Sequence, residues 1–326
     1  MSNIEDVGIL GFGHALPSAV RTNDDPLFAD RPKTDDDSLF HGFRERRVLR
    51  AGESVEMLAV EAARAAIADA GVDPAAIDRI YGAVSPSEHL LPSGLFAVHA
   101  ELGLRRDTSV IPIQSEFTNF AVALTCAWEA IASGRCKLAL VVVAAGWSRM
   151  VDYADAGAVG IGDAAGAVVV GRGGRWLLVD ELSESHGHLR HAMTVELRVP
   201  RRSSPEQGEG VRPTFVFEGA ASSVYRELVV SVPARLFTTL LARHGLRPEE
   251  VALVTHQSTR AALDAWKREL RPGELPIVLD SLGNCTLATV AVTLSLHARR
   301  FQSRHVVLMT FGCGQNFSAL LLRRSR

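Results

Sequence analysis

An internal repeat limits the folds open to this chain more than any other feature of its sequence. Segments 62–85 and 236–258 each contain a helix-like stretch that ends at a glycine, Gly71 or Gly245, followed by a proline three residues later and then by an apolar run. Glycine is the usual residue just past a helix C-terminus, and proline readily begins a new turn. Two copies of one helix-strand pattern predict a duplicated α/β fold whose halves pack against each other.

A second correspondence supports the duplication. The sequences GDAAGAVVVGR at 162–172 and GQNFSALLLRR at 314–324 are both glycine-led turns that run into an apolar strand. Continuous apolar runs are typical of strands that are covered on both faces. We therefore expect a first half at 1–172, a linker or insertion at 173–214, and a second half at 215–326.

Composition and charge argue against several classes of function. The net charge is −2 and the pI about 6.6, so binding to nucleic acid or to an anionic membrane surface is not indicated. The longest apolar run, LALVVVAAG, is too short to cross a bilayer, and the N-terminus shows no charged segment followed by an apolar core. We expect a cytoplasmic protein with no nucleic-acid and no membrane partner.

The four cysteines, Cys126, Cys136, Cys285 and Cys313, form no CxxC pair and no metal-type cluster with histidine. Disulfide scaffolds are small and dense in cysteine, unlike this chain. The pattern predicts free thiols, with neither a metal site nor a cofactor.

The stretch IPIQSEFTNFAVAL has the shape of a reactive element. An apolar strand ends, the chain turns, and an alanine-rich helix begins at about Thr118. A helix N-terminus favours negative charge, so such turns commonly carry a nucleophile. The candidate side chains in this turn are Ser115, Glu116, Phe117 and Thr118.

Three further turns carry polar or flexible residues beside apolar segments. They contain His256, Asn284, and the sequence FGCGQN with Gly312 and Gly314. Ligands in open α/β sheets collect at the carboxyl ends of strands, and in a duplicated fold those ends can meet. The duplication therefore offers a place where these turns can converge.

Together these motifs resemble the β-ketoacyl-acyl-carrier-protein synthase III group of the thiolase superfamily, over nearly the whole chain. GFRERRV is similar to that family's GIRER segment, GDAAGAVVV to GDGAGA, THQS to HQAN, GNCTLAT to GNTSAA, and FGCGQNFSALLL to FGGGFTWG. Several motifs in the same order make the match specific. The resemblance implies the thiolase fold, a duplicated five-layer α-β-α-β-α sandwich.

The resemblance also implies a mechanism and a set of site residues. In the family a cysteine takes an acyl group from a thioester, and a His and an Asn stabilise the enolate oxygen formed when malonyl-carrier protein loses carbon dioxide. His256 and Asn284 match these two hydrogen-bond donors, and Gly312, Gly314 and Gly219 match substrate-contacting glycines. Preorganised donors at developing charge are worth about 3–4 kcal/mol each.

This chain departs from the family pattern at the nucleophile. Counting back from FAVAL without a gap places Phe117 at the cysteine position, with Asn119 where the family has a glycine. Condensation through an acyl-cysteine in this turn is therefore excluded. Glu116, Cys313 and Cys285 are possible auxiliary residues: the carboxylate as a base, and the two thiols as neighbours of the reaction centre or as small buried side chains.

The family's clamp for coenzyme A also looks absent, because its aromatic and arginine positions fall near Asp36 and Phe40. The substrate is expected to be a thioester of an acyl-carrier protein or of coenzyme A, with the missing clamp favouring a carrier-bound or free substrate. The resemblance further implies a homodimer, or a heterodimer with a related synthase, paired through segment 111–143.

Three functions stay open. The first is an acyl-thioester-processing enzyme that works without an acyl-cysteine, by acyl transfer, decarboxylation or direct condensation, in fatty-acid-like or polyketide and secondary-metabolite biosynthesis. The second is a catalytically silent subunit that pairs with an active paralogue. The third is a protein that binds and presents an acyl carrier without chemistry. The presence of both His256 and Asn284 favours the enzyme, and the loss of the cysteine favours the silent subunit.

Overall fold

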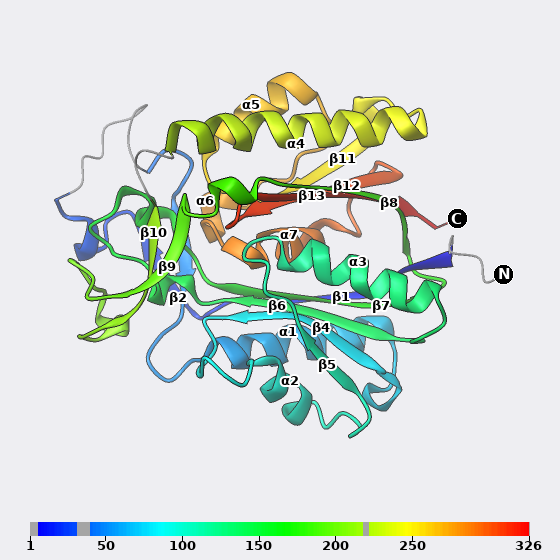
Figure 1. Cartoon of the computed structure of the whole chain (residues 1–326), viewed down its shortest axis with the longest axis horizontal. Helices are drawn as coiled ribbons and strands as arrows, with labels where there is room; N and C mark the ends of the chain where they lie inside the picture. Colours follow the sequence, from blue (N-terminus) through cyan, green and yellow to red (C-terminus); the bar gives the residue numbers. More distant parts are fainter. Residues whose placement is uncertain (1–5, 31–39, 218–221, 326) are drawn as a thin grey trace.

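The computed structural model describes residues 6–30, 40–217 and 222–325 (Figure 1). Nine strands form one continuous sheet in the order β11-β12-β13-β8-β1-β7-β6-β4-β5. In chain order these strands are β1 (Val7–Ala15), β4 (Arg79–Ser85), β5 (Ser109–Pro112), β6 (Ala139–Ala145), β7 (Ala164–Arg172), β8 (Trp176–Ser185), β11 (Val251–Thr255), β12 (His305–Gly312) and β13 (Asn316–Arg324). The α-helices of the described residues are α1 (Val55–Ala70), α2 (Leu95–Glu101), α3 (Asn119–Ala132), α4 (Ser222–His244), α5 (Arg260–Leu270), α6 (Leu279–Leu282) and α7 (Thr289–His297).

The strands form two sets that face each other across a central helical layer (Figure 1). β8 and β1 join the sets through a short antiparallel pairing. Helices α3 and α7 each contact strands of both sets, so they lie between them. α4 packs on one set with α5 beside it, and α1 packs on the other set with α2 beside it. The predicted five-layer α-β-α-β-α sandwich is confirmed.

Helix α1 shows how the sequence builds an outer layer. Ser54 caps its N-terminus by accepting a hydrogen bond from the Met57 N–H at 3.1 Å, and Gly71 ends it with a φ of 66°. The helix is rich in alanine and lies close against β1, where a Cβ at Gly13 would sit 2.1 Å from the Ala62 carbonyl oxygen. Small side chains on both elements therefore set the spacing of this layer.

The internal repeat has the same form in both halves. In the first, α1 is followed by Gly71, a 3-10 turn (η3, Pro74–Ala76) and β4. In the second, α4 is followed by Gly245 with a φ of 61°, a 3-10 turn (η9, Pro248–Glu250) and β11. β4 pairs parallel with β6, and β11 pairs parallel with β12. The duplicated helix-strand pattern is therefore present in the fold.

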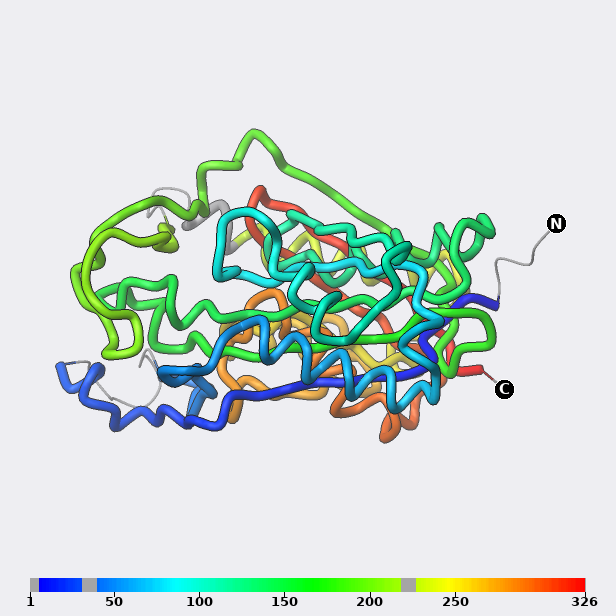
Figure 2. The backbone as a smooth tube through the Cα atoms, turned by 90° about the horizontal axis from the view of Figure 1, so that it is seen from below, coloured from blue at the N-terminus to red at the C-terminus, as the bar shows by residue number. Residues whose placement is uncertain are grey.

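Two short ribbons lie at one end of the molecule, opposite the two termini (Figure 2). They are formed by β2 (Ala19–Thr22) with β3 (Glu45–Val48), and by β9 (Met193–Arg198) with β10 (Arg212–Phe217). The segment 173–214, expected as a linker or insertion, contains β9 but also β8, which is paired with β13 and β1. The division of the chain at 172 and 215 stays a prediction. The other 3-10 turns are η2 (Pro26–Phe28), η4 (Trp147–Arg149), η5 (Ala156–Gly160), η6 (Gly187–Leu189), η7 (Pro205–Gln207) and η10 (Thr286–Ala288).

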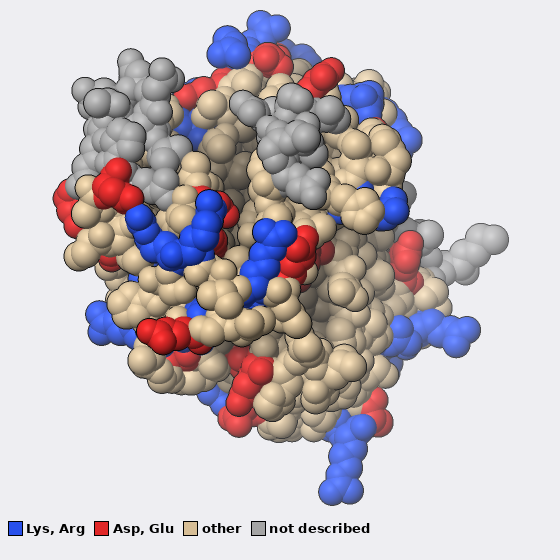
Figure 3. Space-filling model, turned by 60° about the vertical axis from the view of Figure 1, so that its left-hand side comes forward, with Lys and Arg blue, Asp and Glu red and all other residues tan. Residues whose placement is uncertain are grey.

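Two surface properties bear on partners. On the face seen in Figure 3, basic and acidic side chains are interspersed and do not gather into a patch of one sign. Within the described residues, every helix is too short or too polar to span a lipid bilayer.

Candidate active site

The turn between β5 and α3 is held in a strained conformation. Phe117 has a φ of 74°, a left-handed value that is unusual for a bulky residue and costs roughly 1–3 kcal/mol. Its N–H donates to Asn119 Oδ1 at 2.9 Å, and Asn119 Nδ2 donates to the Ile113 carbonyl at 2.9 Å. Thr118 is the N-cap of α3, so the predicted start of the helix is confirmed.

The polar side chains of this turn are occupied by one another. Ser115 Oγ and Thr118 Oγ1 lie 2.6 Å apart, and Asn316 Nδ2 donates to both oxygens at 3.0 Å. Among the described residues the hydrogen-bond partners of Ser115 Oγ are Thr118 and Asn316, neither of which is a base, so the geometry does not support Ser115 as a nucleophile.

The Phe117 ring lies among aromatic side chains from both halves of the chain. It is 7% exposed, with ring centroids 4.7 Å from Trp147, 6.3 Å from Phe215 and 5.8 Å from His256. The phenyl and imidazole planes are nearly parallel, at 8°. The fold thus brings the first-half turn against the end of β11, where His256 lies.

His256 is 3% exposed, and its Nδ1 lies 3.1 Å from the Thr286 carbonyl oxygen. A carbonyl can only accept, so Nδ1 carries the ring proton and Nε2 presents a lone pair. Burial lowers the pKa of His256 to about 4, which keeps the ring neutral near neutral pH. In this tautomer Nε2 of the neutral ring is an acceptor, and the donor role expected for His256 stays a prediction.

Asn284 is oriented by the same residue. Its Oδ1 accepts from the Thr286 N–H at 2.9 Å, so Nδ2 is the donor end of the side chain, and within the described residues it has no hydrogen-bond partner. The Asn284 backbone is held on both sides, by its N–H to Gly160 O at 2.7 Å and its C=O from Gly162 N at 3.0 Å. Thr286 itself has a φ of 45°. One strained residue, Thr286, thus orients a proton acceptor and a donor, and sequence reasoning missed it because its backbone performs this role.

The FGCGQN turn packs directly on the Phe117 turn. A Cβ at Gly312 would lie 2.1 Å from the Glu116 carbonyl oxygen and 2.5 Å from Phe117 Cβ. The Cys313 N–H donates to that same Glu116 oxygen at 3.0 Å. Gly314 has a φ of 77° and open space around its Cα. Of the predicted substrate-contacting glycines, Gly312 and Gly314 lie in this turn, and Gly219 lies outside the described residues.

The two thiols near the site are poor nucleophiles. Burial, with a further contribution from the Glu116 carboxylate, raises the pKa of Cys313 to about 12. Cys285 is 1% exposed, and its thiol donates to the Leu282 carbonyl at 3.4 Å. Burial raises the pKa of Cys285 far above its ordinary value. Reaction with a thioester needs the thiolate, so neither residue is prepared for it.

Glu116 is tied to the end of β4. Its Oε1 accepts from Ser85 Oγ at 2.8 Å, and Ser85 Oγ accepts from Trp147 Nε1 at 3.2 Å. Oε2 is buried and, among the described residues, has no partner. Burial raises the pKa of Glu116. These contacts place its carboxyl beside Ser85 and Trp147, two residues that the sequence did not single out, and among the described residues no hydrogen bond joins it to His256.

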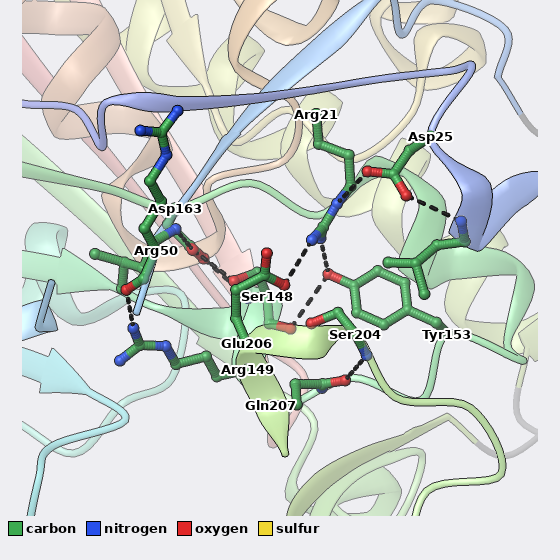
Figure 4. Close-up of polar contacts among 12 residues, drawn as sticks. Arg21, Asp25, Arg50, Ser148, Arg149, Tyr153, Asp163, Ser204, Glu206 and Gln207 are labelled. Atoms are coloured by element: carbon green, nitrogen blue, oxygen red, sulfur yellow. Dashed lines mark hydrogen bonds and ion pairs between the residues drawn. The ribbon is translucent and has the colours of Figure 1, made fainter. Parts of the chain in front are cut away.

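Two polar networks hold the loops that carry Ser148 and Glu206 (Figure 4). Asp163, from the GDAAGA motif, accepts from Ser148 N at 2.9 Å, Ser148 Oγ at 2.5 Å and Leu49 N at 2.8 Å. Arg21 donates to Tyr153 Oη at 2.7 Å and pairs with Glu206 at 2.9 Å. The first network fixes the residue next to Trp147, and the second ties segment 202–207 to the first half.

Of the two positions expected for the coenzyme A clamp, the structure describes one. Asp36 lies outside the described residues. Phe40 is buried and packs edge-on against Phe28, with ring centroids 5.5 Å apart. This aromatic ring is part of the core.

Comparison with known proteins gives a consistent set of relatives. The family model of 3-oxoacyl-(acyl-carrier-protein) synthase III matches residues 113–185, and the model of its C-terminal part matches residues 241–324. The beta-ketoacyl-(acyl-carrier-protein) synthase III of Rhodospirillum centenum is 31% identical, covering 97% of this chain and 98% of the relative. Synthase III 1 of Vibrio cholerae is 30% identical, with the same coverage.

Solved structures agree with this result. The 3-oxoacyl-(acyl-carrier-protein) synthase III of Aquifex aeolicus matches with a TM-score of 0.82 and 26% identity, over 97% of this chain and 99% of that one. The enzyme of Pseudomonas aeruginosa matches with a TM-score of 0.83 and 25% identity, over 98% and 99%. The priming β-ketosynthase of the R1128 polyketide pathway matches with a TM-score of 0.80 at 23% identity, over 98% of this chain and 97% of that one, a likeness of fold.

Proposed function

The chain belongs to the 3-oxoacyl-(acyl-carrier-protein) synthase III family, and on that premise we propose that it transfers acyl groups from thioesters directly to an acceptor, without an acyl-cysteine. In this proposal Phe117 occupies the position of the family's nucleophile. The thioester is carried by an acyl-carrier protein or by coenzyme A, in keeping with the names of the relatives. The pathway is of the fatty-acid or polyketide kind.

The observation that carries the proposal is the double contact of Thr286. Its carbonyl fixes the proton on His256 Nδ1, and its N–H fixes the orientation of the Asn284 amide. A lone pair and a donor held by one residue suit a reaction in which a proton leaves the attacking group while negative charge grows on a carbonyl oxygen.

The transfer then proceeds in two steps. A hydroxyl or amine of the acceptor attacks the thioester carbon, His256 Nε2 takes its proton, and Asn284 Nδ2 donates to the oxyanion. Collapse of the tetrahedral intermediate breaks the C–S bond, and the leaving thiolate takes the proton from His256. The neutral state of His256, caused by its burial, supplies the acceptor that the first step requires.

Thiol release tests this proposal. The probes are acetyl-coenzyme A and acetyl-carrier protein, each with and without a simple alcohol or amine as acceptor. We expect acceptor-dependent release of thiol, and a loss of about 10²–10³-fold in both His256→Ala and Asn284→Ala. His14→Ala is the matched control, because His14 is bonded to Ser295 on another part of the fold. Equal rates of thiol release in the unaltered chain, His256→Ala, Asn284→Ala and His14→Ala would overturn the proposed transfer.

The pH profile gives an independent readout of His256. An imidazolium cannot accept a proton, so activity falls as His256 protonates. With a pKa of about 4, kcat/KM is expected to stay level on the acid side down to about pH 5 and to fall below it. A fall centred near pH 6.5, the ordinary histidine value, would contradict a buried neutral base.

A second function, a silent subunit of a heterodimer, is favoured by one observation. The Phe117 ring lies nearly parallel to the His256 imidazole with ring centroids 5.8 Å apart, and His256 is almost fully buried. If the chain is a silent subunit, it forms a complex with an active relative. His256→Ala and Asn284→Ala then each change the turnover of that complex by no more than a few-fold, whereas substitutions in the subunit interface abolish it. The assay uses the complete complex, because an isolated inactive chain fits both functions.

Dimerisation is part of the proposal for either function. β5 is one of the two edge strands of the sheet and, within the described residues, pairs with β4 alone, and its residues are half-buried or exposed. An unpaired edge strand is suited to pairing with another chain. Sedimentation at micromolar concentration should show a dimer, alone or with a related synthase, and a monomer in both cases would disprove it.

A further inference from the structure

Two backbone N–H groups, that of Phe117 and that of Cys313 in the FGCGQN turn packed against it, are both already bonded. The Phe117 N–H donates to Asn119 Oδ1 at 2.9 Å. The Cys313 N–H donates to the Glu116 carbonyl at 3.0 Å. Paired backbone N–H groups at a strained turn are a common way to hold a developing oxyanion. Here neither group is available to a ligand.

The orientation of the Asn119 amide is determined by its second contact. Asn119 Nδ2 lies 2.9 Å from the Ile113 carbonyl oxygen, and a carbonyl can only accept. Oδ1 is therefore the atom that faces the Phe117 N–H. Asn119 is fully buried, so water does not compete for either bond. The carboxamide oxygen takes the place of a substrate carbonyl oxygen.

We propose that Asn119 closes this turn to covalent acyl transfer independently of Phe117, because its side-chain oxygen occupies the N–H that a thioester oxyanion would need at residue 117. The inference rests on the proposed function, in which thioesters enter this site. It makes Asn119 a specificity-determining residue, which separates direct transfer from transfer through a covalent intermediate.

The blocked reaction is a thiol exchange. A cysteine at 117 would attack the thioester carbon, forming a new C–S bond while negative charge grows on the carbonyl oxygen. Collapse would break the original C–S bond, and the proton of the attacking thiol would pass to the leaving thiolate. With Asn119 in place, the oxyanion finds the Phe117 N–H already bonded. The Cys313 N–H does not replace it, because its acceptor is a main-chain carbonyl.

The test compares four full-length variants: Phe117→Cys, Phe117→Cys with Asn119→Gly, Phe117→Cys with Asn119→Ala, and Phe117→Cys with Asn316→Ala. Asn316 is the matched control, since its amide bonds Ser115 and Thr118 of the same turn but leaves the Phe117 N–H alone. Each variant is incubated with acetyl-coenzyme A and with acetyl-carrier protein. Intact-mass spectrometry and peptide mapping follow the acetyl adduct on residue 117.

We expect the variants lacking the Asn119 oxygen to be acylated at least about 10²-fold faster than Phe117→Cys alone, and the Asn316 control to behave like the single variant. Iodoacetamide labelling shows whether the cysteine at residue 117 is accessible, and circular dichroism shows whether each variant is folded. If the variant with Asn119→Gly fails to fold, the variant with Asn119→Ala still tests the proposal. Equal acylation of the single and double variants, or no adduct in folded double variants, would overturn the proposal.

Thiol release by the unaltered chain is measured in parallel. If the unaltered chain releases no thiol, the direct transfer proposed above is wrong. The acylation rates of the single and double variants would still decide the role of Asn119.

Discussion

The two turns that meet at the Phe117–His256 contact differ in what they leave for a substrate. In the first-half turn, Asn119 uses the Phe117 N–H and Asn316 uses the two hydroxyls beside it. In the second-half turns, Thr286 binds one end of His256 and one end of Asn284 and leaves the other ends without a partner among the described residues.

Both turns contain a non-glycine residue with positive φ, 74° at Phe117 and 45° at Thr286. Such conformations persist only where the surroundings hold them, and they concentrate at functional sites. The strain therefore does not distinguish the turns. What distinguishes them is the hydrogen-bond inventory: in the first turn the Phe117 N–H and the two hydroxyls are bonded, and the second orients groups for something else.

The largest expected effect concerns Cys313, the thiol closest to the first-half turn. Raising its pKa from the ordinary 9 to about 12 lowers its thiolate fraction near pH 8 by about 10³-fold. Alkylation by iodoacetamide should be slower than that of N-acetylcysteine by a factor of this order. Peptide mapping, with Cys313→Ser to assign the peak, measures it. A rate like that of the free amino acid would mean that the first-half turn still holds a reactive thiol.

A second prediction contrasts two glycines of the turn that packs on Phe117. Gly312→Ala places a methyl group against the backbone of Glu116 and should lower the free energy of unfolding by about 3 kcal/mol. Gly314→Ala meets no atom within 4 Å but has a φ of 77°, so it should cost only about 1 kcal/mol. Urea unfolding of both variants decides the matter. Similar losses would show that the turn is not pressed against Glu116.

The smallest expected effect is a difference between Asn119 and Asn284 in their contributions to the free energy of unfolding. Asn119→Ala leaves the buried Phe117 N–H and the Ile113 carbonyl without their partners, which should cost about 2–3 kcal/mol in unfolding free energy. Asn284→Ala removes one hydrogen bond from a half-buried side chain and should cost about 1 kcal/mol or less. Should Asn284 prove as important for stability as Asn119, the second-half turn would be structural too.

Much of the architecture could be predicted from the sequence. The glycine-proline punctuation at Gly71 and Gly245 and the continuous apolar strands describe a duplicated α/β sandwich, because these signals reflect local backbone preference and burial. The start of α3 near Thr118 follows from the same kind of local signal. The motifs around His256 and Asn284 indicated the family, which the relatives confirm.

The chemistry of the site could not be predicted in the same way. Whether His256 donates or accepts depends on the Thr286 carbonyl, thirty residues further along the chain. The position of the Glu116 carboxyl depends on its hydrogen bond from Ser85, which lies at the end of another strand. Sequence patterns report burial and local conformation, but they do not report which distant group meets a given atom.

The sequence by itself determined the repeat, the layers, the absence of a thiol in the first-half turn and the family. Each of these depends on residue identity or on short-range preferences. Only the tertiary structure decided that Asn119 consumes the Phe117 N–H, that the phenyl and His256 imidazole planes run parallel, and that one residue, Thr286, orients both His256 and Asn284. Hydrogen bonds and ring contacts need atoms placed to within a fraction of an ångström, and only the packed fold supplies that placement.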